Sequence, residues 1–332
     1  MLTAKITVAL VATLAAAALW RQWRGVEVET AERSRLQSSW ILNGALDWGR
    51  LILAGDARES SVDHLGEPWA VPLQEARLST FLAGGEASTE TEREAFLSGE
   101  VTDLQSRLNV MNLLFETSSD DGNPSGGASG RDPSEPDPKR PLERFRRLFS
   151  ALNLPEQELE ALERNLARAH AAMKSADPLN QADAPLMPQR FDQLVWLGLS
   201  PLTLETLRPY ATLLPLMSGA ATKVNLNTAT AQAIYAAVPE LDLAGAERLV
   251  SERDRSYYRN AKSALQQVQR SDASPLTSDW VGVTTDFFEI RGRLRLDDLA
   301  VQETSVVHRS ASGQRRTVQV LWRQRMALSA PE

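Results

Sequence analysis

Residues 1–56 decide the fold, and they read MLTAKITVALVATLAAAALWRQWRGVEVETAERSRLQSSWILNGALDWGRLILAGD. The run from Met1 to Trp20 is apolar or small except for Lys5. About 20 helical residues, each rising about 1.5 Å, span the ~30 Å hydrocarbon core of a membrane. Helical periodicity continues past this run as far as Gly55-Asp56, a typical helix stop. The stretch therefore predicts one helix of about 50 residues, of which residues 1–24 form the membrane-spanning part.

The second half of this helix carries an apolar stripe. Its members recur every four residues and are Leu36, Trp40, Gly44, Trp48 and Ile52, widened by Ile41, Ala45 and Leu51. Such a stripe is typical of a helix lying on a globular domain, so we expect Trp40 and Trp48 to pack in a core. The alternative is a cleavable signal peptide with a site near Ala15–Ala18. The unbroken helical pattern beyond residue 20 favours a retained membrane helix.

The middle of the chain is predicted to be helical and its end to be a sheet. Residues 118–141 are rich in Gly, Pro, Ser and Asp and predict an exposed flexible loop. Helices are expected at 141–174, 191–197, 201–214, 228–238 and 243–253. Period-2 alternation predicts strands at 287–296, 300–308 and 317–326, and shorter strand-like runs occur at 77–81 and 96–101.

These elements predict an α+β protein with one domain inserted into another. Residues 25–114 and 281–328 supply the long helix and the strands of the first domain. Residues 115–280 form an inserted all-α domain, within which residues 224–253 resemble a helix-hairpin-helix. Trp280 and the pair Phe287-Phe288 are expected in the core.

Composition excludes several classes of site. The 332 residues contain no cysteine, so a disulfide framework, a thiolate zinc site and a cysteine nucleophile are ruled out. The three histidines, His64, His170 and His308, are far apart in sequence, which argues against a multi-histidine metal centre. A formal net charge of -7 argues against nucleic acid as a partner.

Four segments carry a resemblance to a known family. They are VALVATLAAAALWRQW at residues 8–23, DHLGEPWA at 63–70, VTDLQSRLN at 101–109 with Asn112 after it, and VNLNTA at 224–229. Together they are similar to minor pseudopilin K of type II secretion systems over essentially the whole chain. The resemblance implies a type IV pilin-like domain, formed by a long N-terminal helix and an antiparallel sheet, with a large helical domain inserted.

The same resemblance implies a function. Members of this family are structural subunits at the tip of the pseudopilus, where they help to initiate and cap assembly for protein secretion across the outer membrane. It implies contact with minor pseudopilins I and J, with other pseudopilins and with the inner-membrane secretion platform. It also implies a single-pass protein of the bacterial inner membrane with its globular part in the periplasm. No enzyme activity is expected.

The motif residues are expected to be structural. They are Asp63, His64, Gly66, Glu67, Pro68, Trp69, Asp103, Arg107, Asn109, Asn112, Asn225 and Asn227. Asp63-His64 could also be an acid–histidine pair of a hydrolase, but no Ser or Cys nucleophile is tied to it. A turn shaped by Gly66 and Pro68, with Trp69 plugging the domain, is the simpler interpretation.

No cofactor is expected, and a metal site is not predicted with the residues available. The family often carries an aspartate-rich calcium loop, and the matching stretch at 170–191 retains only Asp177 and Asp183. Calcium takes six to eight oxygen ligands, so two aspartates are too few unless the acidic loop at 116–137 contributes.

Two further patterns have competing interpretations. The helix-hairpin-helix-like segment could make this a membrane-anchored periplasmic module that binds nucleic acid. Its hairpin, Pro239–Asp242, lacks the glycines that present amides to phosphate and carries two carboxylates instead. We expect Asn227 or Thr228 to cap the next helix. Arg144, Arg146 and Arg147 are expected to be a solvated face, with a basic docking patch as the alternative.

The segment after Trp23 is expected to act in assembly. Its charged residues are Glu27, Glu29, Glu32, Arg33 and Arg35. Mixed charges on one helix can set the register with neighbouring subunits.

Overall fold

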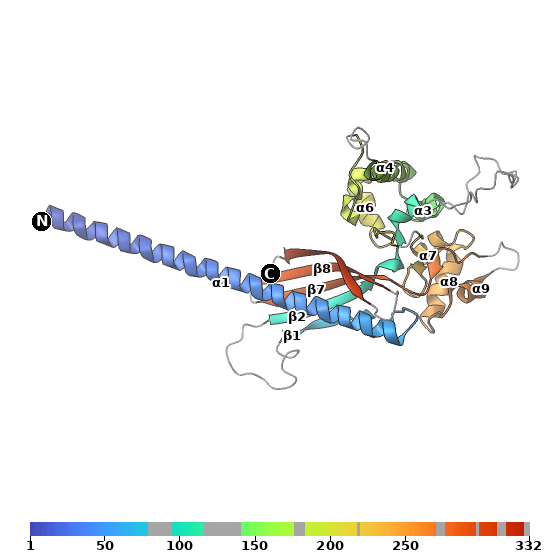
Figure 1. Ribbon diagram of the computed structural model, residues 1–332, viewed down its shortest axis with the longest axis horizontal. Coiled ribbons are helices and arrows are strands. Elements are labelled where there is room, and N and C mark those ends of the chain that lie inside the picture. The colour runs from blue at the N-terminus through green and yellow to red at the C-terminus, as the bar shows by residue number, and fades with distance from the viewer. Residues whose placement is uncertain are drawn as a thin grey trace.

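The computed structural model describes residues 1–78, 95–115, 141–175, 183–217, 220–269, 276–296, 299–310 and 317–328. The predicted loop at 118–141, except Pro141, and the calcium candidate Asp177 lie outside these ranges, and so does most of the predicted strand at 77–81. Three parts follow one another along the long axis in Figure 1: a free helix, a sheet covered by the same helix, and a body of shorter helices.

Helix α1 runs from Leu2 to Glu59 without interruption. Its first half stands free of the rest of the protein, and its second half lies across the sheet (Figure 1). In the described part of the chain α1 is the one helix that is long and apolar enough to cross a membrane, and none of its apolar window is buried. The predicted long helix is therefore present, and it is compatible with a membrane anchor.

The sheet has five antiparallel strands in the order β1-β2-β7-β8-β9. They span Leu73–Arg77, Ala95–Asp103, Phe287–Leu296, Leu299–Arg309 and Val318–Leu328. The first two strands precede the helical body in sequence and the last three follow it. The whole of β2 pairs with β7, from Ala95 opposite Leu296 to Asp103 opposite Phe288. The chain thus leaves the sheet and returns to it at one point.

The face of α1 that packs on the sheet overlaps the predicted stripe only in part, at Ile41, Ala45 and Ile52. Leu42, Leu46 and Leu53 are buried, whereas Trp40 is 77% exposed and Trp48 is 52% exposed. Gly49 explains the choice, because a Cβ added there would lie 3.2 Å from Ile290 of β7. Small residues let the helix approach the sheet closely, and the wide indoles remain outside. The expectation that Trp40 and Trp48 are core residues is wrong.

The helical body lies between β2 and β7 in sequence. Its helices are α3 (Pro141–Ala151), α4 (Glu156–Lys174), α6 (Pro201–Leu207), α7 (Ala231–Ala237), α8 (Leu243–Arg253) and α9 (Ala261–Val268), with the 3-10 helix η4 at Phe191–Leu197. One large hydrophobic cluster fills it, including Phe145, Leu162 and Ile234. The α+β class predicted from the sequence is confirmed.

Short elements connect the two parts. Three 3-10 helices, η1 (Pro68–Ala70), η2 (Leu104–Ser106) and η3 (Val110–Leu114), surround the point where the chain leaves the sheet. The two-residue strand β3 (Leu108–Asn109) pairs in parallel with β4 (Ala211–Thr212), and β5 (Val224–Asn225) pairs with β6 (Val281–Gly282). The connection therefore contains extended chain that the helical pattern did not predict, and the helix expected at 201–214 ends at Leu207.

Candidate functional site

Asp103 is the centre of a buried polar junction between the sheet and the helical body. It is the last residue of β2 and the N-cap of η2. Its Oδ1 accepts a hydrogen bond of 2.6 Å from the amide of Gln105. Its Oδ2 accepts from Asn225 Nδ2 at 3.0 Å, Thr228 Oγ1 at 2.5 Å and Thr285 Oγ1 at 2.7 Å. One carboxylate thus joins the end of β2 to the start of α7 and to the return of the chain into β7.

Burial dominates the electrostatics of this carboxylate. Asp103 is 2% exposed, and loss of solvent raises its pKa to about 6, although the four hydrogen bonds act to lower it. The side chain is therefore ionised at neutral pH. In that state both oxygens act only as acceptors, which matches the four donors around them.

The asparagines of the motifs act as substitutes for backbone hydrogen bonds. Asn109 pairs with Leu214 in both directions, and Asn112 pairs in the same way with Thr222. Asn227 donates to the carbonyl of Tyr258 and accepts from its amide. Asn225 Nδ2 reaches the carbonyl of Asp63 as well as Asp103. Because an amide side chain both donates and accepts, each asparagine can hold the backbone of a connecting segment in place where helix or strand hydrogen bonds do not.

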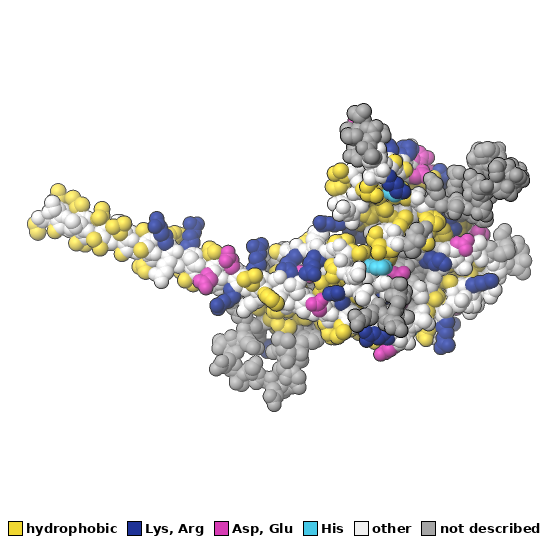
Figure 2. All heavy atoms as spheres, in the orientation of Figure 1, with side chains coloured by type: hydrophobic (Ala, Val, Ile, Leu, Met, Phe, Trp, Pro, Cys, Tyr) yellow, Lys and Arg dark blue, Asp and Glu magenta, His cyan; other side chains and the backbone are white. Residues whose placement is uncertain are grey.

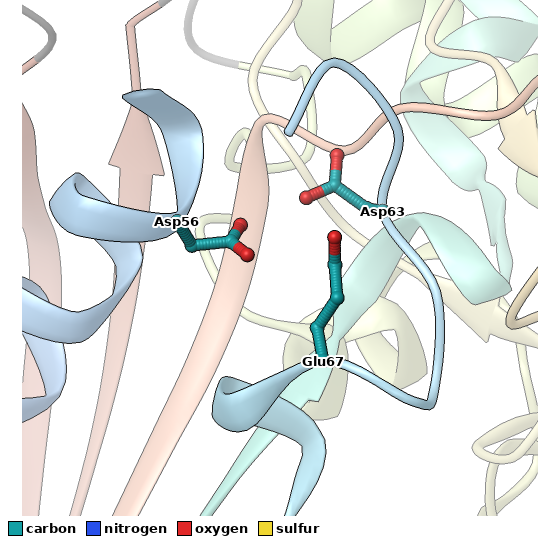
Figure 3. Close-up of side chains that lie close together, drawn as sticks. All are labelled: Asp56, Asp63 and Glu67. Atoms are coloured by element: carbon teal, nitrogen blue, oxygen red, sulfur yellow. The ribbon is translucent and has the colours of Figure 1, made fainter. Parts of the chain in front are cut away.

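Beside this junction lies a cluster of three carboxylates, Asp56, Asp63 and Glu67 (Figure 3). Arg309, the last residue of β8, donates from Nη1 to Asp56 Oδ2 at 2.9 Å and from Nη2 to Asp63 Oδ1 at 2.5 Å. Its Nη2 also donates to the carbonyl of Thr285, whose amide donates to Asp63 Oδ2. A buried guanidinium therefore ties the end of α1 and the following loop to the end of β8.

The cluster still holds more negative than positive charge. The pKa of Asp56 is raised to about 6, chiefly by burial, with Glu67 and Asp63 acting in the same direction and Arg309 acting to lower it. Burial likewise raises the pKa of Asp63, against the guanidinium of Arg309 and the amide of Thr285. Within this cluster, the raised pKa of Asp56 makes the end of α1 sensitive to pH near 6.

The DHLGEPWA motif forms a tight turn around Trp69. Trp69 is 2% exposed, donates from Nε1 to Glu67 Oε2 at 2.7 Å and meets Phe288 edge-on at 5.1 Å. Glu67 Oε2 also accepts from the amide of His64, and the amide of Gly66 donates to His64 Nδ1. Pro68 is the first residue of η1. The turn brings Trp69 into the hydrophobic cluster between α1 and the sheet.

This geometry does not suit a hydrolase. Both carboxylate oxygens of Asp63 bind Arg309 and Thr285, and neither binds His64. The His64 ring stacks on Tyr257 at 3.9 Å, with Nδ1 used as an acceptor. A catalytic dyad requires the acid to orient the imidazole through a hydrogen bond, which these partners replace.

The cluster also does not fit a metal ion. It is the one group of three or more acidic, histidine or cysteine side chains in the described ranges close enough to share an ion. Arg309 already occupies the position of the cation, and two of the carboxylates bind it. Calcium needs six to eight oxygen ligands free of other partners. Of the calcium candidates, Asp183 is exposed and its carbonyl accepts from Arg168.

The helix-hairpin-helix-like segment is held by side chains that the sequence patterns did not assign. Thr230 caps α7 by accepting from the amide of Ala233, so the expected caps Asn227 and Thr228 are wrong. Those two residues instead bind Tyr258 and Asp103. Asp242 caps α8 by accepting from Gly245 at 2.7 Å. The carboxylate of Asp242 therefore occupies the backbone amides at the N-terminus of α8, where a phosphate would have to bind.

The arginines of α3 are not a solvated face. Arg144 is 3% exposed, donates to the carbonyl of Ala237 and stacks on Trp280. Arg147 donates to the carbonyls of Tyr235 and Leu241. Both guanidiniums satisfy carbonyls at the end of α7, which would otherwise lack partners. Only Arg146 fits the expectation of surface ion pairs, through Glu143 and Glu156.

The remaining predicted residues lie outside this junction. The charged residues expected to act in assembly, Glu27, Glu29, Glu32, Arg33 and Arg35, are all exposed on the free part of α1. Arg107 belongs to the same motif as Asp103 but points into a separate pocket.

Several contributors to the junction were not predicted. Arg309, Thr285 and Asp56 carry no local pattern that marks them, because each is defined by contacts with residues far away in sequence. Gln105 lies inside the quoted motif, and it donates to the carbonyl of Lys223 and accepts from the amide of Asp286. Its position two residues after Asp103 in VTDLQSRLN is the sequence feature that could have placed it in the junction.

A long N-terminal helix laid across an antiparallel sheet defines the class of type IV pilin-like subunits, as the sequence predicted. The crystal structure of the GspK–GspI–GspJ complex from the enterotoxigenic Escherichia coli Type 2 Secretion System contains a chain of similar fold. Its TM-score is 0.59 and its sequence identity 15%, over 89% of this chain and 98% of that chain. No curated protein matches this chain in sequence.

Two models of the family described as "Type II secretion system (T2SS), protein K" match residues 106–216 and 224–284. Together they cover more than half of the chain. The chain belongs to this family, the minor pseudopilin K of type II secretion. The matched ranges contain Asn109, Asn112, Asn225 and Asn227, and they end just before the strands β7–β9.

Proposed function

We propose that this chain is the subunit at the tip of a type II secretion pseudopilus, where it initiates and caps assembly together with minor pseudopilins I and J. Helix α1 anchors it in the inner membrane, and the globular part lies in the periplasm. Family membership supports the role in secretion, and the related chain of similar fold is described in a complex with GspI and GspJ. The polar junction serves this role by fixing the helical body on the sheet.

The position of the helical body is the observation that carries the proposal. It lies beyond the C-terminal end of α1, at the opposite end of the molecule from the N-terminus (Figure 1). Subunits of pilin-like fibres pack their N-terminal helices side by side, so a subunit added above this one would have to occupy the space of that body. The shape therefore favours a terminal position and few copies per fibre.

The outer face of α1 offers the surface for neighbours. Leu36, Trp40, Trp48 and Leu51 are 52–77% exposed. Below them the helix carries a band of charged side chains, visible in Figure 2 between the apolar end and the sheet. Apolar residues beside mixed charges are the composition of a helix that packs against other helices and sets its register by charge.

Exchanging residues on the two faces of α1 should separate stability from assembly. We expect Leu42→Ala to lower the free energy of unfolding by about 2–4 kcal/mol, because it leaves a cavity against Leu294 and Val301. Trp40→Ala should change stability by less than about 0.5 kcal/mol and weaken capture of an I–J pair. Urea denaturation and pull-down of the full-length chain in detergent measure both. A large loss of stability in Trp40→Ala would contradict the observed packing.

Cysteine cross-linking tests the tip proposal directly. The chain contains no cysteine, so single cysteines can be placed at Glu27, Glu29, Glu32, Arg33 and Arg35 without background. We expect adducts with pseudopilin I or J from one helical face only. Leu202→Cys, on an exposed position of α6, is the control and should give none. Absence of any pseudopilin adduct, or long fibres formed by this chain alone, would refute the proposal.

A further inference from the structure

Arg107 differs from the other residues of its motif. Asp103, Asn109 and Asn112 are buried with every polar group engaged. Among the described residues, Arg107 has no partner in a hydrogen bond or ion pair, although its side chain is largely shielded from water. Removing a charge from water costs free energy unless interactions with a partner compensate for the lost hydration. A guanidinium that carries this cost without a hydrogen bond or ion pair to a described residue is suited to a partner from outside.

The Arg107 guanidinium lines a pocket between the sheet and the helical body. The pocket has a volume of about 90 Å³. Arg190, Phe191 and Arg208 line it from the helical body, and Glu289 and Trp322 line it from strands β7 and β9. It is therefore formed by both parts of the molecule, next to the polar junction that fixes them. Its lining includes three arginines, two aromatic residues and the two acidic residues Asp192 and Glu289.

The other charges of the pocket already have partners. Arg208 binds Asp192 at 2.6 Å and Glu205 at 2.9 Å. Arg190 donates to Gln324 and lies over the ring of Trp322, and Glu289 binds Arg291 at 2.6 Å. Arg107 is left as the unused cation of the described pocket. Burial lowers its pKa, the nearby carboxylates of Glu289 and Asp103 act to raise it, and the guanidinium remains protonated at neutral pH.

We propose that this pocket receives the carboxylate of an acidic side chain from a neighbouring pseudopilin, and that Arg107 binds it through two parallel N–H···O bonds. A guanidinium presents its donors in a fork that matches a carboxylate. A volume of about 90 Å³ accommodates one such side chain and excludes a nucleotide or a peptide segment. Phe191 and Trp322 supply apolar walls for its methylene groups.

The location of the pocket favours a protein occupant. Strand β9 is the edge strand of the sheet, and among the described residues it pairs with β8 alone, which leaves its other side for an approaching chain. Trp322 and Gln324 place the pocket beside that open edge. This inference rests on the proposed function, because it takes the partner to be a subunit of the same assembly.

Binding to an I–J pair tests the inference with the full-length chain in detergent micelles. We expect Arg107→Gln to weaken binding at least about 10-fold, because it removes the cation facing a desolvated carboxylate. Arg107→Lys should recover only part of the loss, since an ammonium lacks the two-pronged geometry. Arg164→Gln is the matched control, because Arg164 forms an exposed pair with Glu160 on α4. Unchanged affinity in Arg107→Gln would overturn the inference and leave the proposed function standing.

A second measurement distinguishes failure of the Arg107 inference from failure of the proposed function. If the unaltered chain does not bind I–J, the proposed function fails, and the pocket is then examined with N-acetylglutamate amide as the probe. The probe should shift the Nε–Hε resonance of Arg107, identified by its loss in Arg107→Gln, and inorganic phosphate should shift it less. An equal or larger shift with phosphate would mean a free-anion site, and no shift with either would mean no site. Both results overturn the inference.

Discussion

Replacing Arg309 by methionine should lower the free energy of unfolding by about 3–5 kcal/mol at pH 8, because it leaves Asp56 and Asp63 buried without their cation. Arg309 is 7% exposed, and its guanidinium joins three segments: the end of α1, the following loop and the turn before β7. Arg164→Met, on an exposed pair of α4, should cost less than about 0.5 kcal/mol. Chemical denaturation of the full-length variants compares the two.

The loss in Arg309→Met should depend on pH. Arg309 lowers the pKa of Asp56 and Asp63, so its removal raises both further above their unfolded values. A carboxyl group whose pKa is raised by folding stabilises the protein while it is protonated, and that contribution disappears as pH rises through the folded pKa. The deficit should therefore be smaller at pH 5 than at pH 8. A deficit that is constant between these values would show that the carboxylates are not coupled to the guanidinium.

Asp103→Asn should cost about 2–4 kcal/mol at pH 7, although it changes one atom. The carboxylate accepts from four donors, and an amide supplies one acceptor and one donor group. In one orientation the new Nδ2 faces the amide of Gln105, and in the other it faces Asn225, so a buried donor is unpaired either way. Asp183→Asn, on an exposed side chain, is the control and should be neutral. Equal stability of Asp103→Asn and the unaltered chain would contradict this account of the junction.

The two variants should change the pH dependence in opposite directions. The pKa of Asp103 is about 6 in the fold and near 3.8 when unfolded, so this residue makes the unaltered chain less stable as pH rises from about 4 to 6. Asparagine cannot titrate, and Asp103→Asn should flatten that slope, whereas Arg309→Met should steepen it and extend it to higher pH. Unfolding free energies measured at pH 4.5, 6 and 8 for the three proteins test both signs.

Local patterns predicted the elements that depend on local sequence. The apolar run and its helical continuation correspond to α1, and period-2 alternation predicted β7, β8 and β9 within two residues at each end. Both patterns repeat over ten or more residues, so neighbouring tertiary contacts do not override them. The short strands β3 to β6 have two residues each and no periodicity that a sequence can reveal.

Choices between faces and between partners could not be predicted in this way. Helix α1 has two apolar faces, and close approach at Gly49 decides which one packs on the sheet. Arg144 and Arg147 look like surface charges until the carbonyls of α7 are placed against them. For the junction, the motifs predicted Asp63, Asp103 and Asn225 individually, but their convergence with Arg309 depends on contacts across more than 200 residues of chain.

The pairing of Asp103 with Phe288 has a consequence for the order of folding. It closes a loop of about 185 residues, and loop closure costs entropy that must be lost before β2 and β7 gain any contact. The helical body has its own hydrophobic cluster, built from contacts within that loop. Once it is folded, it holds β3 beside β4 and β5 beside β6, which brings the two ends of the loop together and removes most of this cost. We therefore expect the five-stranded sheet to form last, so that a newly made chain presents unpaired strand edges until its helical body is complete.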